Sequence, residues 1–309
     1  MQRVGHSQVL SHTLSKVQFN GGVALVSHLD RIVYLNGSFL KGRDAKISIF
    51  DRGLLFADSV YEGLGVLQGR IIDRTMHLQR LKRSLAELQI PNPLSDEAYF
   101  AIFDNLIDRN NLDEGFVYLQ ITRGEADRDY VYSTDLKPNV LAFVQSGPEP
   151  GNPVVGRAMQ THLDLRWKRR DIKTTNLLGQ VIAKTAADAG GAYEALLIDD
   201  EGRITEGGAT SFFIVRGGTL IARPVDNLIL HGITRQTMLR VAEELGYDVA
   251  FRKITLAEAL AADEAFITGA SSYIEPVVQI DGQSIGDGKP GIYTMALRTR
   301  YLEVVRAEL

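Results

Sequence analysis

Ser146-Gly147-Pro148-Glu149-Pro150-Gly151-Asn152-Pro153 divides the sequence into two unequal parts. The stretch holds three prolines and two glycines in eight residues. Proline lacks a backbone N–H and clashes with a preceding helical turn, so neither a helix nor a central strand persists at that density. We therefore predict a linker over residues 146–153, a smaller domain over 31–145 and a larger domain over 154–309.

Strand and helix patterns alternate on the N-terminal side of this linker. Asn36-Gly37 stands between two short apolar runs, which is typical of a β-hairpin and places the start of folded structure near residue 31. Gln68-Gly69 indicates a second hairpin, and leucines at helical spacing from residue 78 to 88 predict a helix capped by Thr75. The elements expected here are strands over 32–35, 38–40, 60–67, 70–73, 116–122 and 140–145, and helices over 78–88 and 96–111.

The C-terminal side alternates as well. Gly190-Gly191 ends an apolar-striped helix, and Thr255-Leu256-Ala257-Glu258 is a capping box that predicts a short helix. The other elements expected are helices over 234–245 and 292–309 and strands over 195–198, 203–205, 211–215, 265–268 and 277–280. Alternating elements on both sides of the linker predict a two-domain protein of the α/β (α+β) class.

Composition and charge exclude several classes of function. Lys plus Arg is 34 and Asp plus Glu is 38, and the resulting net charge of −4 does not indicate a nucleic-acid surface. The absence of cysteine excludes disulfides and thiol chemistry, and no two histidines stand at metal-ligand spacing with a carboxylate. No apolar run approaches the roughly 18 residues of a membrane helix or the ~7 of a signal peptide. We expect a cytoplasmic protein with a polar extension over residues 1–30, no metal, and no membrane or nucleic-acid partner.

Three places could bind an anion. Gly232-Ile233-Thr234 precedes a predicted helix, whose free N–H groups and positive dipole end suit phosphate; the alternative is an ordinary threonine cap. Thr268-Gly269-Ala270-Ser271-Ser272 is small and rich in hydroxyls, and could equally be a polar loop. Arg80 stands on a leucine-striped helix, where most arginines are solvated. These residues alone leave the two interpretations of each place open.

Two further residues carry reactive groups, and one glycine-rich stretch does not match a dinucleotide-binding loop. Glu206 lies in a glycine-rich bend between two predicted strands. It could be an acid of the loop or a carboxylate that points inward at a cation. Lys173 precedes a helix, but spacing does not single it out among the ten lysines. Gly63-Leu64-Gly65-Val66-Leu67-Gln68-Gly69 runs into a hairpin turn and does not open a helix, so we interpret it as a strand approached closely by its neighbours.

Seven short motifs occur together in one order and spacing. They are Ser48-Ile49-Phe50-Asp51-Arg52-Gly53, Tyr61-Glu62-Gly63, His77-Leu78-Gln79-Arg80-Leu81, Asp171-Ile172-Lys173, Asn176-Leu177-Leu178-Gly179, Thr205-Glu206-Gly207 and Gly232-Ile233-Thr234-Arg235. From about Ile32 to the C-terminus, the chain resembles the class IV, or fold-type IV, pyridoxal-phosphate-dependent aminotransferases, most closely the D-amino-acid aminotransferases. The resemblance implies a smaller N-terminal α/β domain and a larger, β-rich C-terminal domain that binds pyridoxal 5′-phosphate.

The resemblance also implies a role for each cofactor residue. Lys173 would form the Schiff base with the cofactor aldehyde and later move a proton, and Glu206 would pair with the pyridine nitrogen. Arg80 would hold the phosphate, and Leu230 would pack on the ring. The phosphate cup would be completed by the segments that contain Ile233, Thr234, Ala270 and Ser271. The loop after Glu206 has Gly207-Gly208-Ala209 where serines are common in the family, so fewer hydroxyls are available there.

The substrate residues implied by the resemblance are Tyr61, Arg128 and Tyr130. Arg128 would bind the substrate carboxylate, a task that suits a bidentate guanidinium, and in a homodimer it would act across the interface. D-specific members often carry Arg-x-His here, whereas this chain has Arg128-Asp129-Tyr130, and Arg128 could instead be solvated or paired with a neighbouring aspartate. The expected reaction is transamination between a D-amino acid and pyruvate or 2-oxoglutarate. The alternatives are branched-chain L-amino acids, (R)-amines, aminodeoxychorismate lyase activity, or a non-catalytic binding protein on the same fold.

Overall fold

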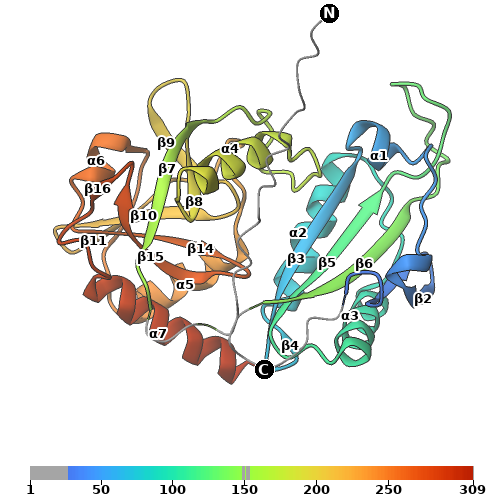
Figure 1. Ribbon diagram of the computed structural model, residues 1–309, viewed down its shortest axis with the longest axis horizontal. Helices are drawn as coiled ribbons and strands as arrows, with labels where there is room; N and C mark the ends of the chain where they lie inside the picture. The colour runs from blue at the N-terminus through green and yellow to red at the C-terminus, as the bar shows by residue number, and fades with distance from the viewer. Residues whose placement is uncertain (1–26, 148–149, 151–153, 309) are drawn as a thin grey trace, which may run out of the picture.

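The computed structural model describes residues 27–147, 150 and 154–308, and it forms two lobes, each built on one β-sheet (Figure 1). Most of the predicted linker, and the predicted extension as far as residue 26, lie outside the described residues. The first sheet ends at Ser146 and the second begins at Arg157, on either side of the proline-rich stretch. Neither lobe contains, within the described part of the chain, a helix long and apolar enough to cross a membrane.

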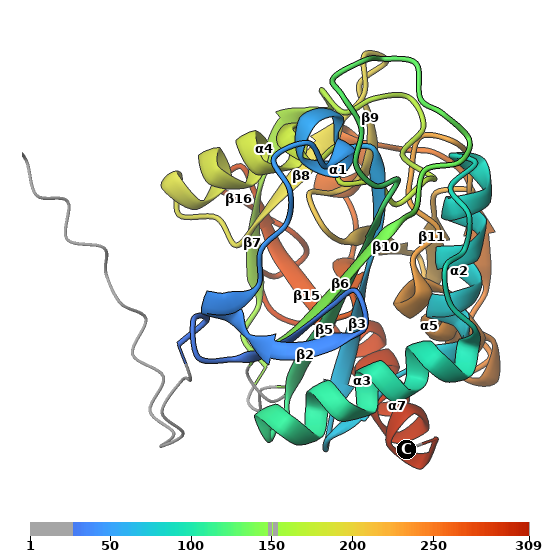
Figure 2. The same cartoon turned by 90° about the vertical axis from the view of Figure 1, so that its right-hand side faces the viewer.

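The first sheet has six strands in the order β2-β1-β6-β5-β3-β4. Its strands are β1 (Ile32–Leu35), β2 (Ser38–Lys41), β3 (Ser59–Leu67), β4 (Arg70–Ile71), β5 (Gly115–Thr122) and β6 (Asn139–Ser146). The helices α2 (Arg74–Glu87) and α3 (Asp96–Asn110) lie on the same side of this sheet (Figure 2) and bury its alternate residues in one hydrophobic core. Strand alternation therefore leaves the other residues of β3 and β5 free to face the second lobe.

The second sheet has ten strands, nine of them in the order β12-β11-β10-β14-β15-β7-β8-β9-β13, with β16 paired to β15. They are β7 (Arg157–Leu163), β8 (Glu194–Ile198), β9 (Arg203–Gly207), β10 (Ser211–Arg216), β11 (Thr219–Ala222), β12 (Val249–Phe251), β13 (Ile254–Thr255), β14 (Glu264–Gly269), β15 (Tyr273–Ile280) and β16 (Gln283–Ser284). The helices are α4 (Leu178–Ala189), α5 (Ile233–Glu244), α6 (Leu256–Leu260) and α7 (Ile292–Ala307).

Most predicted elements are confirmed to within a few residues. The Asn36-Gly37 hairpin connects β1 and β2, and both turn residues have positive φ, 47° and 94°, as such a turn requires. The capping box at Thr255 and Glu258 is present. The predicted cap at Thr75 is wrong, because α2 begins at Arg74 and Thr75 lies inside its first turn. Five strands of the second sheet, β7, β11, β12, β13 and β16, and the short helices α1 (Arg52–Phe56) and η1 (Gly42–Asp44) were not predicted.

The two lobes meet along β3. The Tyr61 N–H donates to the Lys173 carbonyl at 3.0 Å, and Val60 forms a β-bridge with Thr174. A Cβ on Gly65 would lie 2.4 Å from the Ala270 carbonyl oxygen, so glycine is required for this approach. This contact confirms the interpretation of the glycine-rich stretch as a strand with closely approaching neighbours.

Candidate active site

A cavity of about 370 Å³ lies between the two sheets and is lined by residues of both lobes. All residues predicted to bind the cofactor line it, together with one of the three predicted substrate residues. These residues are Tyr61, Arg80, Lys173, Glu206, Leu230, Ile233, Thr234, Ala270 and Ser271. The fold thus gathers side chains from positions more than 200 residues apart into one site.

Lys173 enters the cavity from the segment that precedes α4, and its Nζ lies 4.2 Å from the centre of the Tyr61 ring. This is within the range of a cation–π contact. Within the described residues, the Lys173 amine forms no ion pair with a carboxylate. No carboxylate in that part of the chain holds the amine, so it can reach an aldehyde group bound in the cavity.

The backbone next to Lys173 is anchored by the buried carboxylate of Asp171. Arg83 of α2 and Arg169 both bind this carboxylate, the first at 2.5 Å and the second at 3.0 Å. Burial alone would raise the pKa of Asp171, but the hydrogen bonds and charges of the two arginines outweigh it and lower that pKa. Because Arg83 belongs to the first lobe and Asp171 to the second, this ion pair also fixes the lobes at the point where Lys173 enters.

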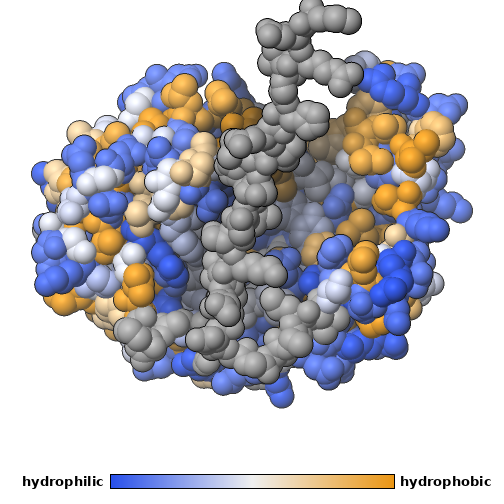
Figure 3. All heavy atoms as spheres, in the orientation of Figure 1, coloured by the Kyte–Doolittle hydropathy of each residue, from blue (hydrophilic) through white to orange (hydrophobic). Residues whose placement is uncertain are grey.

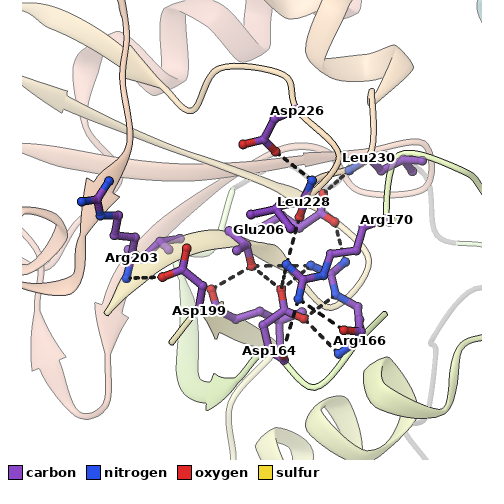
Figure 4. Close-up of polar contacts among 12 residues, drawn as sticks. Asp164, Arg166, Arg170, Asp199, Arg203, Glu206, Asp226, Leu228 and Leu230 are labelled. Carbon is purple, nitrogen blue, oxygen red and sulfur yellow. Dashed lines mark hydrogen bonds and ion pairs between the residues drawn. The ribbon is translucent and has the colours of Figure 1, made fainter. Parts of the chain in front are cut away.

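Glu206 lies on β9 with its side chain buried, and its two oxygens have different partners. Arg166 contacts Oε1 at 2.5 Å, and the Leu230 N–H donates to Oε2 at 3.1 Å (Figure 4). Burial raises the pKa of Glu206, and the charge of Arg166 and its hydrogen bond partly oppose that rise. A second cation, such as a protonated pyridine nitrogen, would add to the stabilisation of the ionised carboxylate.

Arg166 is itself held by Asp164, through contacts of 2.8 and 2.7 Å, and Asp164 also accepts from Thr205 at 2.6 Å. Neither Arg166 nor Asp164 was identified from the sequence. Arg166 opens a run of four cations in five residues, which is typical of a solvated surface, and only the fold shows that its side chain is buried against Glu206.

Arg80 is buried on α2 and bound on two sides. Its Nε and Nη2 donate to the two oxygens of Glu62, each at 2.8 Å, and its Nη1 donates to the His231 carbonyl at 2.9 Å. Burial would raise the pKa of Glu62, but the charge of Arg80 and hydrogen bonds from Arg80 and His77 lower it to about 2. Glu62, to which no role was assigned from the sequence, therefore holds the Arg80 guanidinium in place at the cavity wall.

The start of α5 reaches the cavity beside this arginine. Gly232 is the N-cap and contributes no side-chain hydrogen bond, so the alternative of an ordinary threonine cap at Thr234 is wrong; Thr234 lies buried in the first turn. Thr210 and Thr268 also line the cavity, and their buried hydroxyls have no hydrogen-bond partner among the residues that the structure describes. Buried hydroxyls of this kind are rare without a ligand or water to bind.

These groups fit an anionic, aldehyde-bearing cofactor. Arg80 and the free N–H groups at the start of α5 suit a phosphate, and the two unpartnered hydroxyls can bind oxygen atoms of the same group. Ala270 has no side-chain donor, so its segment can contribute only through its backbone and Ser271. Among the described residues, no group of three or more His, Cys, Asp or Glu could hold a metal ion.

Arg128 and Tyr130, the other two predicted substrate residues, do not line this cavity. The Arg128 guanidinium lies 5.4 Å from the Phe56 ring and 5.5 Å from the Tyr130 ring, and Tyr130 is 76% exposed. Arg52 anchors their loop by donating to the Asp129 carbonyl at 2.6 Å. Arg128 therefore projects from the surface of the first lobe and is not in contact with the cavity of its own chain.

Comparison with known proteins gives the family. A sequence profile of the class IV amino-transferases matches residues 59–280. The D-alanine aminotransferase of Bacillus licheniformis is 36% identical over 277 residues, which cover 89% of this chain and 98% of the relative. That of Listeria innocua is 36% identical over 280 residues, covering 89% and 96%.

A solved structure supports the same assignment. The branched-chain amino acid aminotransferase of T.th. with pyridoxamine 5′-phosphate superposes with a TM-score of 0.83 at 28% identity and covers 90% of this chain and 95% of that one. The profile match, the relatives and this fold agree with the ordered motifs that line the cavity. The chain belongs to the class IV aminotransferase family.

Proposed function

We propose that this protein transfers the amino group of a D-amino acid to a 2-oxo acid, such as pyruvate or 2-oxoglutarate, with pyridoxal 5′-phosphate bound in the cavity. The observation that carries the proposal is the convergence of Lys173, Glu206 and Arg80 on one cavity. The two D-alanine aminotransferases that are 36% identical over most of the chain support D-amino acids as donors. The similarity to a branched-chain enzyme at a TM-score of 0.83 keeps branched-chain L-amino acids as the second candidate.

The residues of the cavity have separate roles in this reaction. When bound, pyridoxal phosphate supplies an aldehyde for the amino group and a ring that withdraws electrons from the substrate Cα. Lys173 would hold the aldehyde end of the cofactor and would move the proton of the substrate Cα, and Glu206 would face the pyridine nitrogen and favour its protonated form. Leu230 packs against the ring, and Tyr61 borders the substrate.

The phosphate of the cofactor is bound at the other groups of the site. Arg80 provides the positive charge, the start of α5 provides backbone N–H groups at Ile233 and Thr234, and the segment of Ala270 and Ser271 closes the cup. The hydroxyls of Thr210 and Thr268, which have no partner in the described part of the chain, would supply hydrogen bonds that the glycines and alanine after Glu206 lack. These interactions hold the cofactor in the same way before and during the reaction, so they contribute to binding more than to rate.

The substrate carboxylate is bound, in this proposal, by Arg128 of a second copy of the chain. Apolar side chains are exposed on one face of α4, where Leu178, Val181 and Ile182 follow helical spacing and are more than half exposed. Leu177 and Gln180, on the adjoining face of the same segment, line the cavity. A partner that covers α4 would therefore also border the active site.

A second exposed apolar surface surrounds α1. Ile49, Phe50 and Leu54 are 71%, 50% and 64% exposed, and apolar atoms gather in the upper part of the right-hand lobe in Figure 3, where Figure 1 draws α1. Exposed apolar side chains that gather in this way are typical of interfaces between proteins. We infer a homodimer in which this surface, together with the adjacent loop of Arg128, meets the partner near its cavity.

A donor panel tests the proposed function. The purified holoenzyme is given D-alanine, D-glutamate, L-leucine or (R)-1-phenylethylamine, with pyruvate or 2-oxoglutarate as acceptor, and kcat/KM is measured for each donor. We expect D-amino acids to be the best donors. A higher kcat/KM for L-leucine than for every D-donor would overturn the proposed stereochemistry but leave transamination intact.

Removal of Arg128 is expected to affect carboxylate donors selectively. Arg128→Ala should lower kcat/KM for D-alanine by about 10²-fold or more, because a charged bidentate contact is lost, and should affect an (R)-amine without a carboxylate much less. Lys137→Ala removes an exposed cation from the same loop and serves as the control. An unchanged kcat/KM for D-alanine in Arg128→Ala would contradict the anchoring role.

Arg80→Ala is expected to weaken cofactor binding more than turnover at saturating cofactor. The variant leaves Glu62 buried without its main cationic partner and removes the charge beside α5. The dissociation constant of pyridoxal phosphate, measured by quenching of protein fluorescence, should rise at least about tenfold. Arg74→Ala, on the exposed face of the same helix, should leave it unchanged, and an equal constant in both variants would exclude a phosphate role for Arg80.

Sedimentation equilibrium tests the homodimer. The wild-type protein should have twice the 34.1 kDa mass of the chain. Val181→Asp places a charge in the centre of the exposed face of α4 and should shift the equilibrium towards the monomer and lower the activity in parallel. A wild-type protein that is monomeric and fully active would exclude a carboxylate anchor from a partner.

A further inference from the structure

Two glycines lie on the cavity side of β3, and only one of them is required by the fold. Gly65 is in contact with the Ala270 carbonyl, as described above. A Cβ built on Gly63, in contrast, has no heavy atom of the described residues within 4 Å. Gly63 lines the cavity, so the missing side chain leaves open space in the cavity wall.

The backbone gives no reason for glycine at this position. Gly63 does not have a positive φ, and it pairs in regular antiparallel register with Tyr118 of β5. Glycine inside a strand weakens it, because it gives up packing and backbone entropy. The fold of the strand therefore does not require the open space beside Gly63, and this space belongs to the cavity.

The walls of this space are aromatic. Tyr61 and Tyr118 stack with their ring centres 5.5 Å apart, and Phe116 also lines the cavity. The Tyr118 hydroxyl donates to Gln120 at 3.0 Å, so it is already bound within the first sheet. What remains for a ligand beside Gly63 is the apolar surface of the rings.

The position of Gly63 places this space next to the reacting group. Tyr61 precedes Gly63 by two residues on the same face of β3. The Lys173 Nζ lies 4.2 Å from the centre of the Tyr61 ring. Gly65, two residues after Gly63, contacts the segment of Ala270 that closes the proposed phosphate cup. Gly63 thus lies between the amine that would bind the cofactor and one end of the cofactor site.

We propose that the space left by Gly63 receives the side chain of the amino donor. This space would favour donors with a large apolar or aromatic side chain, such as D-phenylalanine. This inference rests on the proposed function, since it assigns the substrate side chain to a place beside Lys173. Aromatic walls and an unfilled volume bind a phenyl ring by burial and ring contacts, whereas the methyl group of alanine would leave most of the space empty.

Kinetics with paired donors test the proposal. The ratio of kcat/KM for D-phenylalanine to that for D-alanine is measured in the wild-type holoenzyme, in Gly63→Ala and in Gly63→Val. We expect a ratio above one in the wild type, a lower one in Gly63→Ala, and a fall of at least about tenfold in Gly63→Val, since filling a pocket by one to three carbons changes discrimination to that extent. Gln145→Val adds a β-branched residue to the same face of the same sheet, outside the cavity, and should keep the wild-type ratio.

A binding measurement provides a readout that does not depend on turnover. 3-Phenylpropanoate, which has no amino group, should inhibit the wild type more strongly than propanoate, and this preference should decrease in Gly63→Ala. A wild-type ratio below one, or a ratio that is the same in all three proteins, would overturn the proposal. If only L-donors react, the D-preference fails, and the same comparison with L-phenylalanine and L-alanine decides the role of Gly63 separately.

Discussion

Lys173→Ala is expected to lower kcat for D-alanine by about 10²–10⁴-fold, the loss expected when a positioned proton-transfer group is removed. The reason lies in the site: within the described part of the chain, Lys173 is the cavity-lining amine, and its Nζ lies against the Tyr61 ring without a carboxylate partner. The measurement is kcat for D-alanine with pyruvate at saturating cofactor, so that weaker cofactor binding does not obscure the rate.

The control is Lys168→Ala, which removes an exposed lysine five residues earlier on the same segment. It should keep the wild-type rate. Addition of methylamine should partly restore Lys173→Ala, since a free amine can enter the space of the deleted side chain and accept the proton. A rate in Lys173→Ala within tenfold of the wild type would show that another group moves the proton of Cα.

Glu206→Gln is expected to lower the rate of the half-reaction by about 10²-fold or more, while the cofactor remains bound. The substitution keeps the shape of the side chain and removes its charge, so a pyridine nitrogen beside it loses the partner that favours its protonated form. It also leaves Arg166, whose side chain is 5% exposed, with Asp164 as its remaining carboxylate contact. The measurement is the rate of the absorbance change on mixing the holoenzyme with D-alanine.

Glu201→Gln changes an acid that is 63% exposed, next to the start of β9, and is the matched control. A second control is the dissociation constant of pyridoxal phosphate, which should change far less than the rate. Near-wild-type half-reaction kinetics in Glu206→Gln would mean that Glu206 serves only to bind Arg166 and the Leu230 N–H.

Local chemistry explains which parts of the fold could be predicted from the sequence. The Asn36-Gly37 turn and the capping box at Thr255 depend on a few neighbouring residues, and both are confirmed. β7 was missed because Arg157–Leu163 has no clear alternation of apolar and polar residues, and it is a strand because it pairs in parallel with β8 and β15. Such pairing joins segments distant in the chain, so no local pattern announces it.

The same difference between local and long-range interactions applies to the candidate site. The reactive groups of Lys173, Glu206 and Arg80 were identified through ordered motifs, and the fold brings them to one cavity. The groups behind them, Glu62 beside Arg80 and Arg166 beside Glu206, were not identified, because the partner of a buried charge is chosen in three dimensions. Glu62 stands 18 residues from Arg80, and Arg166 stands 40 from Glu206.

The lysine that binds the cofactor can be mapped by mass spectrometry. The holoenzyme is reduced with borohydride, with or without prior addition of D-alanine or L-alanine and no acceptor, and its peptides are analysed by mass spectrometry. We expect a pyridoxyl group on Lys173, strongly reduced in amount by D-alanine and little affected by L-alanine. A pyridoxyl group on any other lysine, or a label on Lys173 that L-alanine removes faster than D-alanine, would contradict this expectation.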